Sequence, residues 1–584
     1  MTRRRVLALW LVTAGLMLAL PVSASAHAYL IKTSPAASVV LNSAPKTVSL
    51  TYDEAVEPRF AIVSVTDPSG QQLTTGASSR SKANPDTLVV PLSRRLVEGW
   101  YLVYWRAISV DGHPVQGAFT FAVGPNPGPA PQFKVPRVSA TAVTPQLLIT
   151  RWVMFLSVMI AIGLFAMRLL VARPVIRRLP GSSLHALSVA AVAAAAVGLV
   201  AIPVYLDFAT ANDSLRSVFD LGALVPLYSA TAFGRAMLDL ELCFALFTLT
   251  ACIALWVDRP DREHRSLAEL AANTGAVAAA AAVLLVPGAA GHASQTSPRG
   301  VSLGVDWLHL LSGSVWLGGL LGLLVVFISV SDKLPPGAPT RLQVLKVVVP
   351  RFSNVAFACV AVLLASGTVA TIIHLPAVNA LWDTGYGVAI LVKLGLLAGA
   401  MALASGNLLR TKPELVAARE ERGGIGERAS QRLRGLVGGE AVVVTAAVFV
   451  AALLSSLAPP PPSFALGNQA VANVGPGRVA RTVERAGYKL QVIVAPNKAA
   501  TPDSFALRIT KNGQVVTGAS VMLTFNHLEM QMPQQQYILK EVSPGLYSRA
   551  APALVMVGRW GLSFDVDPKG APPFSALVVD QANG

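Results

Sequence analysis

The chain has 584 residues, of which 53% are hydrophobic and only 13% are charged. This balance excludes an ordinary soluble protein, and the length allows several domains. The formal net charge of +16 does not indicate a nucleic-acid partner, because most of the excess arginine lies between long apolar segments, where it sets membrane orientation. We therefore expect a membrane protein that binds no nucleic acid.

The first 26 residues have the pattern of a secretory signal peptide. Arginines begin it at Arg3, an apolar run follows from Val6, and Ala24-Ser25-Ala26 is a small-residue cleavage site. Cleavage there would make His27 the first residue of the mature chain.

Residues 27–124 predict a small β-domain, because short β-rich runs alternate with turn residues. The runs lie at 48–52, 61–66, 87–92, 100–109 and 118–123. The Pro-rich stretch 125–146 is expected to be a linker.

Residues 147–460 hold eight apolar stretches, each long enough to cross a bilayer as a helix. They lie near 147–171, 184–206, 233–257, 268–290, 303–330, 352–374, 387–409 and 437–458. If residues 27–124 are exported, the loops facing the cytoplasm carry 18 lysines and arginines and the opposite loops carry two. This asymmetry agrees with the positive-inside rule and leaves both chain ends outside the cytoplasmic membrane.

A second β-rich region follows the helices, and we expect a β-sandwich over residues 481–570. Residues 461–480 are interpreted as a linker and 571–584 as a tail. The predicted fold class is thus a multidomain membrane protein, with an N-terminal β-barrel, an eight-helix transmembrane bundle and a C-terminal β-sandwich.

Six of the eight histidines fall on the outer side of this topology. They are His27, His113, His292, His309, His374 and His527. The three cysteines lie within predicted helices without CxxC spacing, so they indicate neither disulfides nor a zinc site.

A freed His27 would offer its α-amine and a ring nitrogen from one residue. Asp111 and His113 lie two residues apart, so in an extended strand they point to the same face. This nitrogen and oxygen set suits square-planar Cu(II). The alternative is that Asp111-Gly112 is a turn and His27 a frayed chain end.

Three motifs in residues 27–124 resemble the CopC family: His27-Ala-Tyr-Leu, Leu50-Thr-Tyr-Asp-Glu54, and the run from Tyr104 to Pro114. The resemblance implies a cupredoxin-like β-barrel that binds Cu(II) through His27, Asp111 and His113, with Glu54 at an acidic position near the site. No methionine occurs between Met17 and Met154, so the soft ligands of a Cu(I) site are absent and we expect a Cu(II)-only domain.

Residues 147–460 resemble the CopD family through Gly291-His292-Ala293, the run from Asp306 to Gly319, and Lys393. A CopC domain fused to CopD is similar to bacterial copper-uptake fusions of the YcnJ type. The resemblance implies copper movement across the cytoplasmic membrane. We expect no matching ladder of ligands toward the cytoplasm, where Glu440 and Asn407 are the main polar residues.

Charged and imidazole side chains are costly in a bilayer and usually mark a functional path. Asp306 and His309 share a helix face, and Lys393 lies about two turns into its own helix. We therefore expect His292 and His309, with His374 as a further ligand, to receive copper at the outer mouth of the bundle. The alternative for His374 is a helix-end side chain that reaches the headgroups.

The run from Asn526 to Pro533 resembles a YtkA-like domain. Met530 and Met532 would share a strand face and, with His527 and Met556, could form a soft Cu(I) site. The alternative is that these methionines belong to the core.

The leading interpretation is copper acquisition and transport into the cell, with Cu(II) captured outside and passed to the bundle. One alternative is a haem-dependent cupric reductase with His309 and His374 as axial ligands. Another is a binding protein that delivers copper to an extracytoplasmic chaperone or cuproenzyme without transport. No Walker A motif or nucleophile elbow occurs in the sequence, so we do not expect an enzyme.

Overall fold

The computed structural model describes most of the chain between residues 30 and 583. The residues that it leaves undescribed are 1–29, 37–38, 53–55, 57, 59–60, 94–95, 109–113, 129–130, 132, 134–143, 177–178, 180–182, 215–231, 259–264, 291–297, 330–338, 419–424, 458, 461–463, 466–468, 500–501, 529–534, 552, 556 and 584. The expected signal peptide therefore lies outside the described residues.

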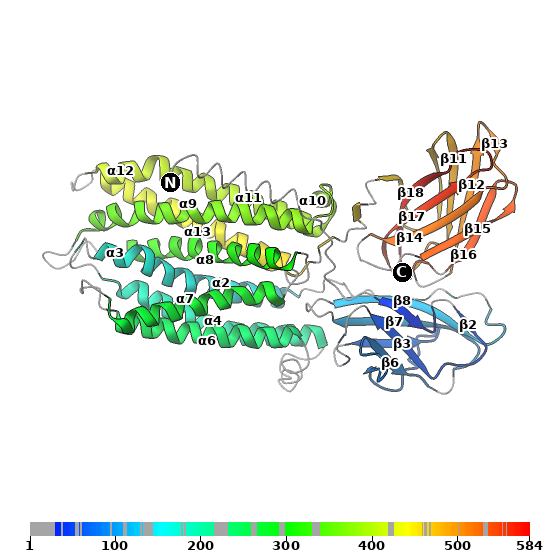
Figure 1. Ribbon diagram of the computed structural model, residues 1–584, viewed down its shortest axis with the longest axis horizontal. Helices are drawn as coiled ribbons and strands as arrows, with labels where there is room; N and C mark the ends of the chain where they lie inside the picture. Colours follow the sequence, from blue (N-terminus) through cyan, green and yellow to red (C-terminus); the bar gives the residue numbers. More distant parts are fainter. Residues whose placement is uncertain are drawn as a thin grey trace. The chain divides into compact units, whose positions relative to one another are not determined.

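The N-terminal domain consists of two four-stranded sheets, in the orders β1-β3-β6-β5 and β2-β8-β7-β4 (Figure 1). Its strands are β1 Leu30–Ser34, β2 Val40–Leu41, β3 Thr47–Tyr52, β4 Ile62–Thr66, β5 Ser79–Arg80, β6 Thr87–Pro91, β7 Gly99–Ile108 and β8 Pro114–Val123. Alternation drives the packing: Val48, Leu50 and Tyr52 of β3 point into the core, while the residues between them are less buried. The five predicted β-rich runs all coincide with strands.

The outer face of β7 and β8 is apolar as well, and part of the expected linker covers it. Phe133 is buried against Trp100, Leu102 and Tyr104. Trp100 Nε1 also donates to the carbonyl of Gly128 (3.0 Å). The domain therefore extends beyond the boundary at residue 124, because its second face also needs an apolar cover.

Eight helices in the middle of the chain are long and apolar enough to cross a membrane, as the sequence predicted. The helical segments are α2 Pro145–Met167, η2 Arg168–Ala172, α3 Arg173–Ile176, α4 His185–Ser214, α6 Ala232–Val257, α7 Leu267–Ala290, α8 Arg299–Ser329, α9 Arg341–His374, α10 Ala380–Asp383, α11 Gly385–Gly406, η5 Asn407–Thr411, α12 Lys412–Ala417 and α13 Ile425–Leu454. The two η segments are π-helices. They continue α2 and α11, so each span is one long rod (Figure 1).

Helices α2 and α8 cross at glycines. A Cβ added at Gly163 would lie 1.9 Å from the carbonyl oxygen of Ser314, and one added at Gly318 would lie 2.2 Å from the backbone of Gly163. Small residues let backbones approach closely where lipid removes most of the hydrophobic drive between helices. The glycines of the α8 motif thus pack helices together.

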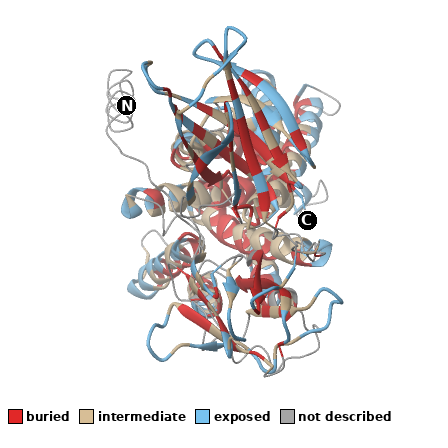
Figure 2. Cartoon of the chain, turned by 90° about the vertical axis from the view of Figure 1, so that its right-hand side faces the viewer, coloured by how far each residue is buried: buried red, intermediate tan, exposed pale blue. Residues whose placement is uncertain are grey.

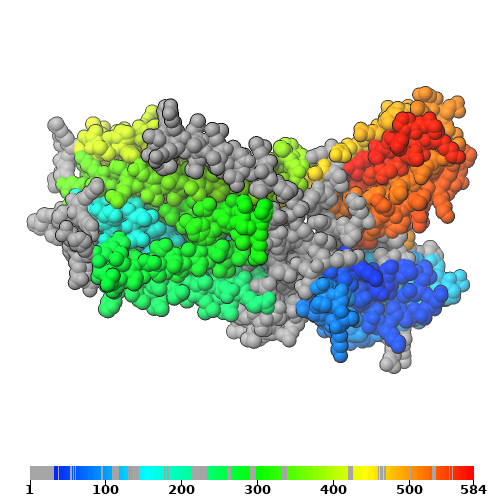
Figure 3. Space-filling view, viewed as in Figure 1, coloured from blue at the N-terminus to red at the C-terminus, as the bar shows by residue number. Residues whose placement is uncertain are grey.

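The outer surface of the bundle carries many exposed apolar side chains. Figure 3 shows one side of the bundle, where the helices are coloured cyan to yellow by sequence position. On α6 alone, Leu242, Leu246, Leu249 and Trp256 are more than half exposed. A soluble protein rarely exposes an apolar surface of this extent, whereas a lipid environment accommodates it. The chain is a multi-pass membrane protein.

The C-terminal domain is one nearly closed sheet of ten strands, ordered β10-β11-β12-β16-β15-β14-β17-β18-β9, with β13 beside β12. Its strands are β9 Ala470–Val474, β10 Val479–Arg485, β11 Tyr488–Ala495, β12 Asp503–Lys511, β13 Gln514–Val515, β14 Ser520–His527, β15 Gln535–Ser543, β16 Leu546–Ala551, β17 Gly558–Asp567 and β18 Phe574–Ala582. Buried residues line the inner faces of the strands, drawn red in Figure 2. Two strands fall outside the range expected from the sequence: β9 lies in the expected linker and β18 in the expected tail.

Candidate functional site

The expected Cu(II) ligands His27, Glu54, Asp111 and His113 lie outside the described residues. The described strands around them are informative. Ile108 pairs with Pro114, so β7 and β8 form a hairpin around 109–113. Leu30 pairs with Tyr52, and the Tyr52 ring contacts Trp105 edge to face at 5.6 Å. The start of β1, the end of β3 and the β7–β8 hairpin therefore share one end of the domain.

Tyr52 also contributes a feature that the sequence did not indicate. Its side chain is almost fully buried, and within the described residues its hydroxyl has no hydrogen-bond partner. Burial raises the pKa of this phenol, so the hydroxyl stays protonated at physiological pH. A neutral donor is thereby held at the end of β3, two residues before Glu54 in the sequence.

His309 lies on α8 and is bonded through both ring nitrogens. Nζ of Lys393 on α11 lies 3.1 Å from Nε2, and Oγ of Ser366 on α9 lies 3.0 Å from Nδ1. Lysine only donates, so Nε2 accepts and the ring proton sits on Nδ1, where it is donated to Ser366. Ser366 in turn donates to the carbonyl of Val362 (2.7 Å). Three helices thus fix one imidazole tautomer.

Asp306 is the acidic member of this cluster. It interacts electrostatically with Lys393 and with Tyr386 on α11. Its carboxylate also lies against the end of α7, where a Cβ added at Gly288 would meet Oδ2 at 2.6 Å. The sequence-based placement of Asp306, His309 and Lys393 in one region of the bundle is therefore consistent with these contacts.

His374 ends α9, and its Nδ1 donates to the carbonyl of Ala370 (2.8 Å). Gly367, two helical turns earlier, faces His309 beside Ser366. His374 is seven residues beyond Gly367, a rise of about 10 Å along the helix. His292 lies outside the described residues. Within the described parts of the chain, no three His, Cys, Asp or Glu side chains are grouped to hold a metal ion.

Further along α8, Trp316 donates its Nε1 hydrogen to Oε1 of Glu440 on α13 (2.9 Å). Both side chains are buried. Trp316 follows His309 by seven residues, so the pair lies about 10 Å further along α8 toward its C-terminal end. Asn407 is half-buried at the start of η5, and its Oδ1 is buried with no partner among the described atoms. Polar groups therefore continue into the bundle, but they are sparse.

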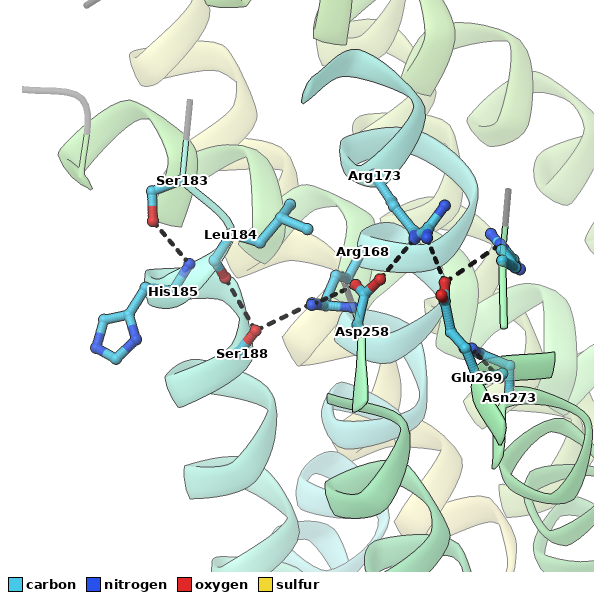
Figure 4. A network of polar contacts seen from close by, with 10 residues as sticks. Arg168, Arg173, Ser183, Leu184, His185, Ser188, Asp258, Glu269 and Asn273 are labelled. Carbon is cyan, nitrogen blue, oxygen red and sulfur yellow. Dashed lines mark hydrogen bonds and ion pairs between the residues drawn. The ribbon is translucent and has the colours of Figure 1, made fainter. Parts of the chain in front are cut away.

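The far end of the bundle holds a buried ion network, shown in Figure 4. Arg173 donates Nε to Oδ1 of Asp258 (2.8 Å) and also pairs with Glu269. Arg168 pairs with Oδ2 of Asp258 at 2.7 Å and donates to Ser188 (3.0 Å). Two arginines and two carboxylates balance, which is what keeps burial of these charges tolerable. The network joins the ends of α2 and α6 to the starts of α4 and α7.

The π-helix η2 explains why two arginines reach one carboxylate. In a regular α-helix, residues five apart point about 140° from each other. In η2 the Arg173 amide bonds the Arg168 carbonyl across five residues, so the wider turn brings both side chains to one side. Both arginines belong to the 18 positive charges that the positive-inside pattern places at the cytoplasmic loops and their edges, and the structure adds that both are buried.

In the C-terminal domain, His527 lies in the core. Its ring meets Trp560 edge to face, with ring centroids 4.8 Å apart. Burial lowers the pKa of this imidazole to about 4, so it is neutral at physiological pH. Met530, Met532 and Met556 lie outside the described residues.

Family models match four segments of the chain. Residues 30–124 match the model described as CopC domain, and 142–301 match Copper resistance protein D-like, N-terminal domain. Residues 346–454 match Copper resistance protein D, and 482–565 match YtkA-like. Asp306 and His309 fall between the two copper resistance protein D segments, whereas His374 and Lys393 fall within the second.

These matches and the fold define a class, the multi-pass membrane proteins that join copper resistance protein C and D modules. The chain belongs to the CopC–CopD fusion proteins and carries a YtkA-like domain at its C-terminal end.

Individual proteins are similar to parts of this chain. Copper transport protein CutJ of Bacillus subtilis is 27% identical over 414 residues, which cover 69% of this chain and 72% of CutJ. Copper resistance protein C of Escherichia coli is 31% identical over 119 residues, 19% of this chain and 94% of that protein. The crystal structure of CopC from Methylosinus trichosporium OB3b is 30% identical and covers 18% of this chain and 98% of its own, with a TM-score of 0.16.

Proposed function

We propose that this protein acquires copper outside the cytoplasmic membrane and moves it through the helical bundle into the cell. One relative is named for copper transport and another for copper resistance. The CopC and CopD modules are both present in this chain. The distribution of positive charge among the loops supports an orientation with both β-domains outside. Partners in this account are copper ions and the bilayer.

In this proposal the N-terminal domain captures Cu(II) through the α-amine and ring of His27 together with Asp111 and His113, with Glu54 nearby. The donor types suit Cu(II), and the lack of methionine in residues 27–124 disfavours Cu(I). Tight Cu(I) binding to these residues would contradict this assignment.

The observation that carries the proposal is the Lys393–His309–Ser366 chain inside an apolar bundle. Ionisable groups within a membrane are expensive, and those that face the bundle interior mark substrate paths. His309 provides the imidazole, Asp306 provides a negative charge that attracts cations, and His292 and His374 complete the proposed outer mouth.

Lys393 determines when His309 is open to a metal, because its ammonium occupies Nε2. Copper would have to displace it. A Lys393→Met variant frees Nε2, so the purified protein should retain more copper after desalting than the wild type. Lys412→Met on α12 is the matched control. Equal copper retention in both variants would contradict the gating role.

Growth in low copper tests the proposal in cells. His309→Ala should abolish copper-dependent growth at unchanged protein level, whereas His185→Ala, an exposed residue at the start of α4, should grow as the wild type does. Normal growth of the His309→Ala strain would refute the role of His309.

The alternatives from the sequence have less support. Haem ligation would need the imidazoles of His309 and His374 on one iron, whereas His374 lies about 10 Å along α9 from Gly367, which faces His309. Delivery to an extracytoplasmic chaperone or cuproenzyme would not need the charged cluster in the bundle. The soft Cu(I) site at Met530, Met532 and Met556 remains a prediction, with His527 a weaker donor because it is packed in the core on Trp560.

A further inference from the structure

A second group of polar side chains lies in the C-terminal domain, away from every residue assigned above to copper. Asn497, Asp503 and Asp580 come from the β11–β12 loop, the start of β12 and the end of β18, and all three are 0% exposed. No salt bridge to either carboxylate occurs within the described part of the domain. Two buried carboxylates without a cation are costly.

Asn497 connects the two carboxylates through its backbone and its side chain. Its backbone amide donates to Oδ1 of Asp503 (2.6 Å), and its Nδ2 donates to Oδ1 of Asp580 (2.9 Å) and to the carbonyl of Gly477 (2.8 Å). These donations fix the orientation of the amide, so Oδ1 is the remaining atom. The backbone of Asn497 is left-handed (φ 63°), a conformation that asparagine tolerates and that most residues avoid.

Three oxygens of this cluster have no partner among the described atoms: Asn497 Oδ1, Asp503 Oδ2 and Asp580 Oδ2. All three are acceptors, and the donors near them are already used by the other oxygens. Buried polar atoms are almost always satisfied in native proteins, so an unpartnered set of this kind points to a missing positive group. Each carboxylate also raises the cost of the other's charge, since Asp580 acts electrostatically on Asp503.

We propose that Asn497, Asp503 and Asp580 bind a hard divalent cation of the calcium class. Carboxylate and amide oxygens are the ligands that Ca²⁺ prefers, and its flexible coordination suits a site built from a loop and two strands. Mg²⁺ keeps several waters in a strict octahedron, which a fully buried site accommodates poorly. Copper is disfavoured because the set contains no nitrogen or sulfur.

The location gives this cation a structural consequence. Asp580 pairs in register with Val474 of β9, and its Oδ1 packs beneath Gly475, where an added Cβ would lie at 2.8 Å. Asp503 holds the β11–β12 loop through the amides of Asn497 and Lys498. A bound cation would tie the first strand of the domain, this loop and the last strand together.

Hydrogen exchange of the full-length protein in detergent tests the proposal. After chelator treatment, CaCl₂, MgCl₂ and CuSO₄ are added separately, and peptides covering 488–503 and 574–582 are followed by mass spectrometry. At a calcium concentration 100 times its Kd, exchange in these peptides should slow by up to about 100-fold. Magnesium should act more weakly and copper should have no effect.

Variants assign the effect to the cluster. Asp503→Asn keeps an oxygen for the two backbone amides, so the fold should persist while the calcium effect is lost, and Asp580→Asn should lose it too. Asp567→Asn removes an exposed carboxylate of β17 and should respond as the wild type does. The proposal is overturned if calcium leaves wild-type exchange unchanged, if Asp503→Asn responds fully, or if only acidification protects these peptides, since protons would then fill the cluster.

Discussion

Replacing Arg173 by methionine should destabilise the bundle more than any other single arginine substitution in the buried ion network. Arg173 bonds both Asp258 and Glu269. Asp258 would keep Arg168 at 2.7 Å, but Glu269, with a side chain only 1% exposed, would keep only Arg265 at 3.6 Å. A buried carboxylate that loses its partner costs about 3 to 5 kcal/mol.

The matched control is Arg265→Met, because that side chain is 29% exposed and its pair with Glu269 is long. Its loss should cost less than about 1 kcal/mol. The double variant Arg173→Met/Glu269→Met removes the stranded charge, so it should recover about 1 to 3 kcal/mol relative to the sum of the single variants. Unfolding of the purified full-length protein by SDS, followed by tryptophan fluorescence, measures each variant. Equal losses for Arg173→Met and Arg265→Met would refute this reasoning.

Two further predictions concern packing and pH. Gly318→Leu should abolish the yield of folded protein in size-exclusion chromatography, because the leucine side chain would overlap the backbone of Gly163. Gly395→Leu is the control and should keep the wild-type yield, because no atom lies within 4 Å of an added Cβ there. Equal yields of the two variants would contradict this prediction. The pKa of His527 is lowered to about 4 from an ordinary value of about 6.5, so the unfolded chain binds the proton more tightly. Its contribution to stability is present above pH 6.5 and is lost as the pH falls toward 4, by up to about 3 kcal/mol. His527→Phe should remove this acid sensitivity, which denaturant titrations between pH 7 and 5 would measure. A difference in the free energy of unfolding between His527→Phe and the wild type that stays constant across this pH range would contradict the assignment.

Much of the fold was predictable, because both kinds of element leave a strong signal. Eight apolar runs of membrane length became eight helices, and alternating runs such as 48–52 became strands. The edges of the C-terminal domain were not predictable in this way. β9 joins the sheet as an end strand by pairing in parallel with β18, and no local pattern encodes a pairing between residues about 100 positions apart.

Among the charged residues, too, the placement of some could be predicted from the sequence and the placement of others could not. The region of Asp306, His309 and Lys393 could be predicted because charge inside an apolar run is conspicuous. The burial of Arg168 and Arg173 could not be predicted, because in a sequence an arginine at a helix end looks the same whether it faces headgroups or a buried carboxylate. Asp258 and Glu269, acidic residues at the edges of two apolar runs, were the available signal. Ser366 gave none, since serine is common in membrane helices.

Uptake of radioactive copper into proteoliposomes of known orientation tests whether this protein moves copper through its helical bundle. The account predicts time-dependent accumulation with the wild type when copper is added on the side of the two β-domains, and loss of that accumulation with His309→Ala but not with His185→Ala. Accumulation that is the same for wild-type and His309→Ala proteoliposomes, or no accumulation above protein-free vesicles, would contradict it.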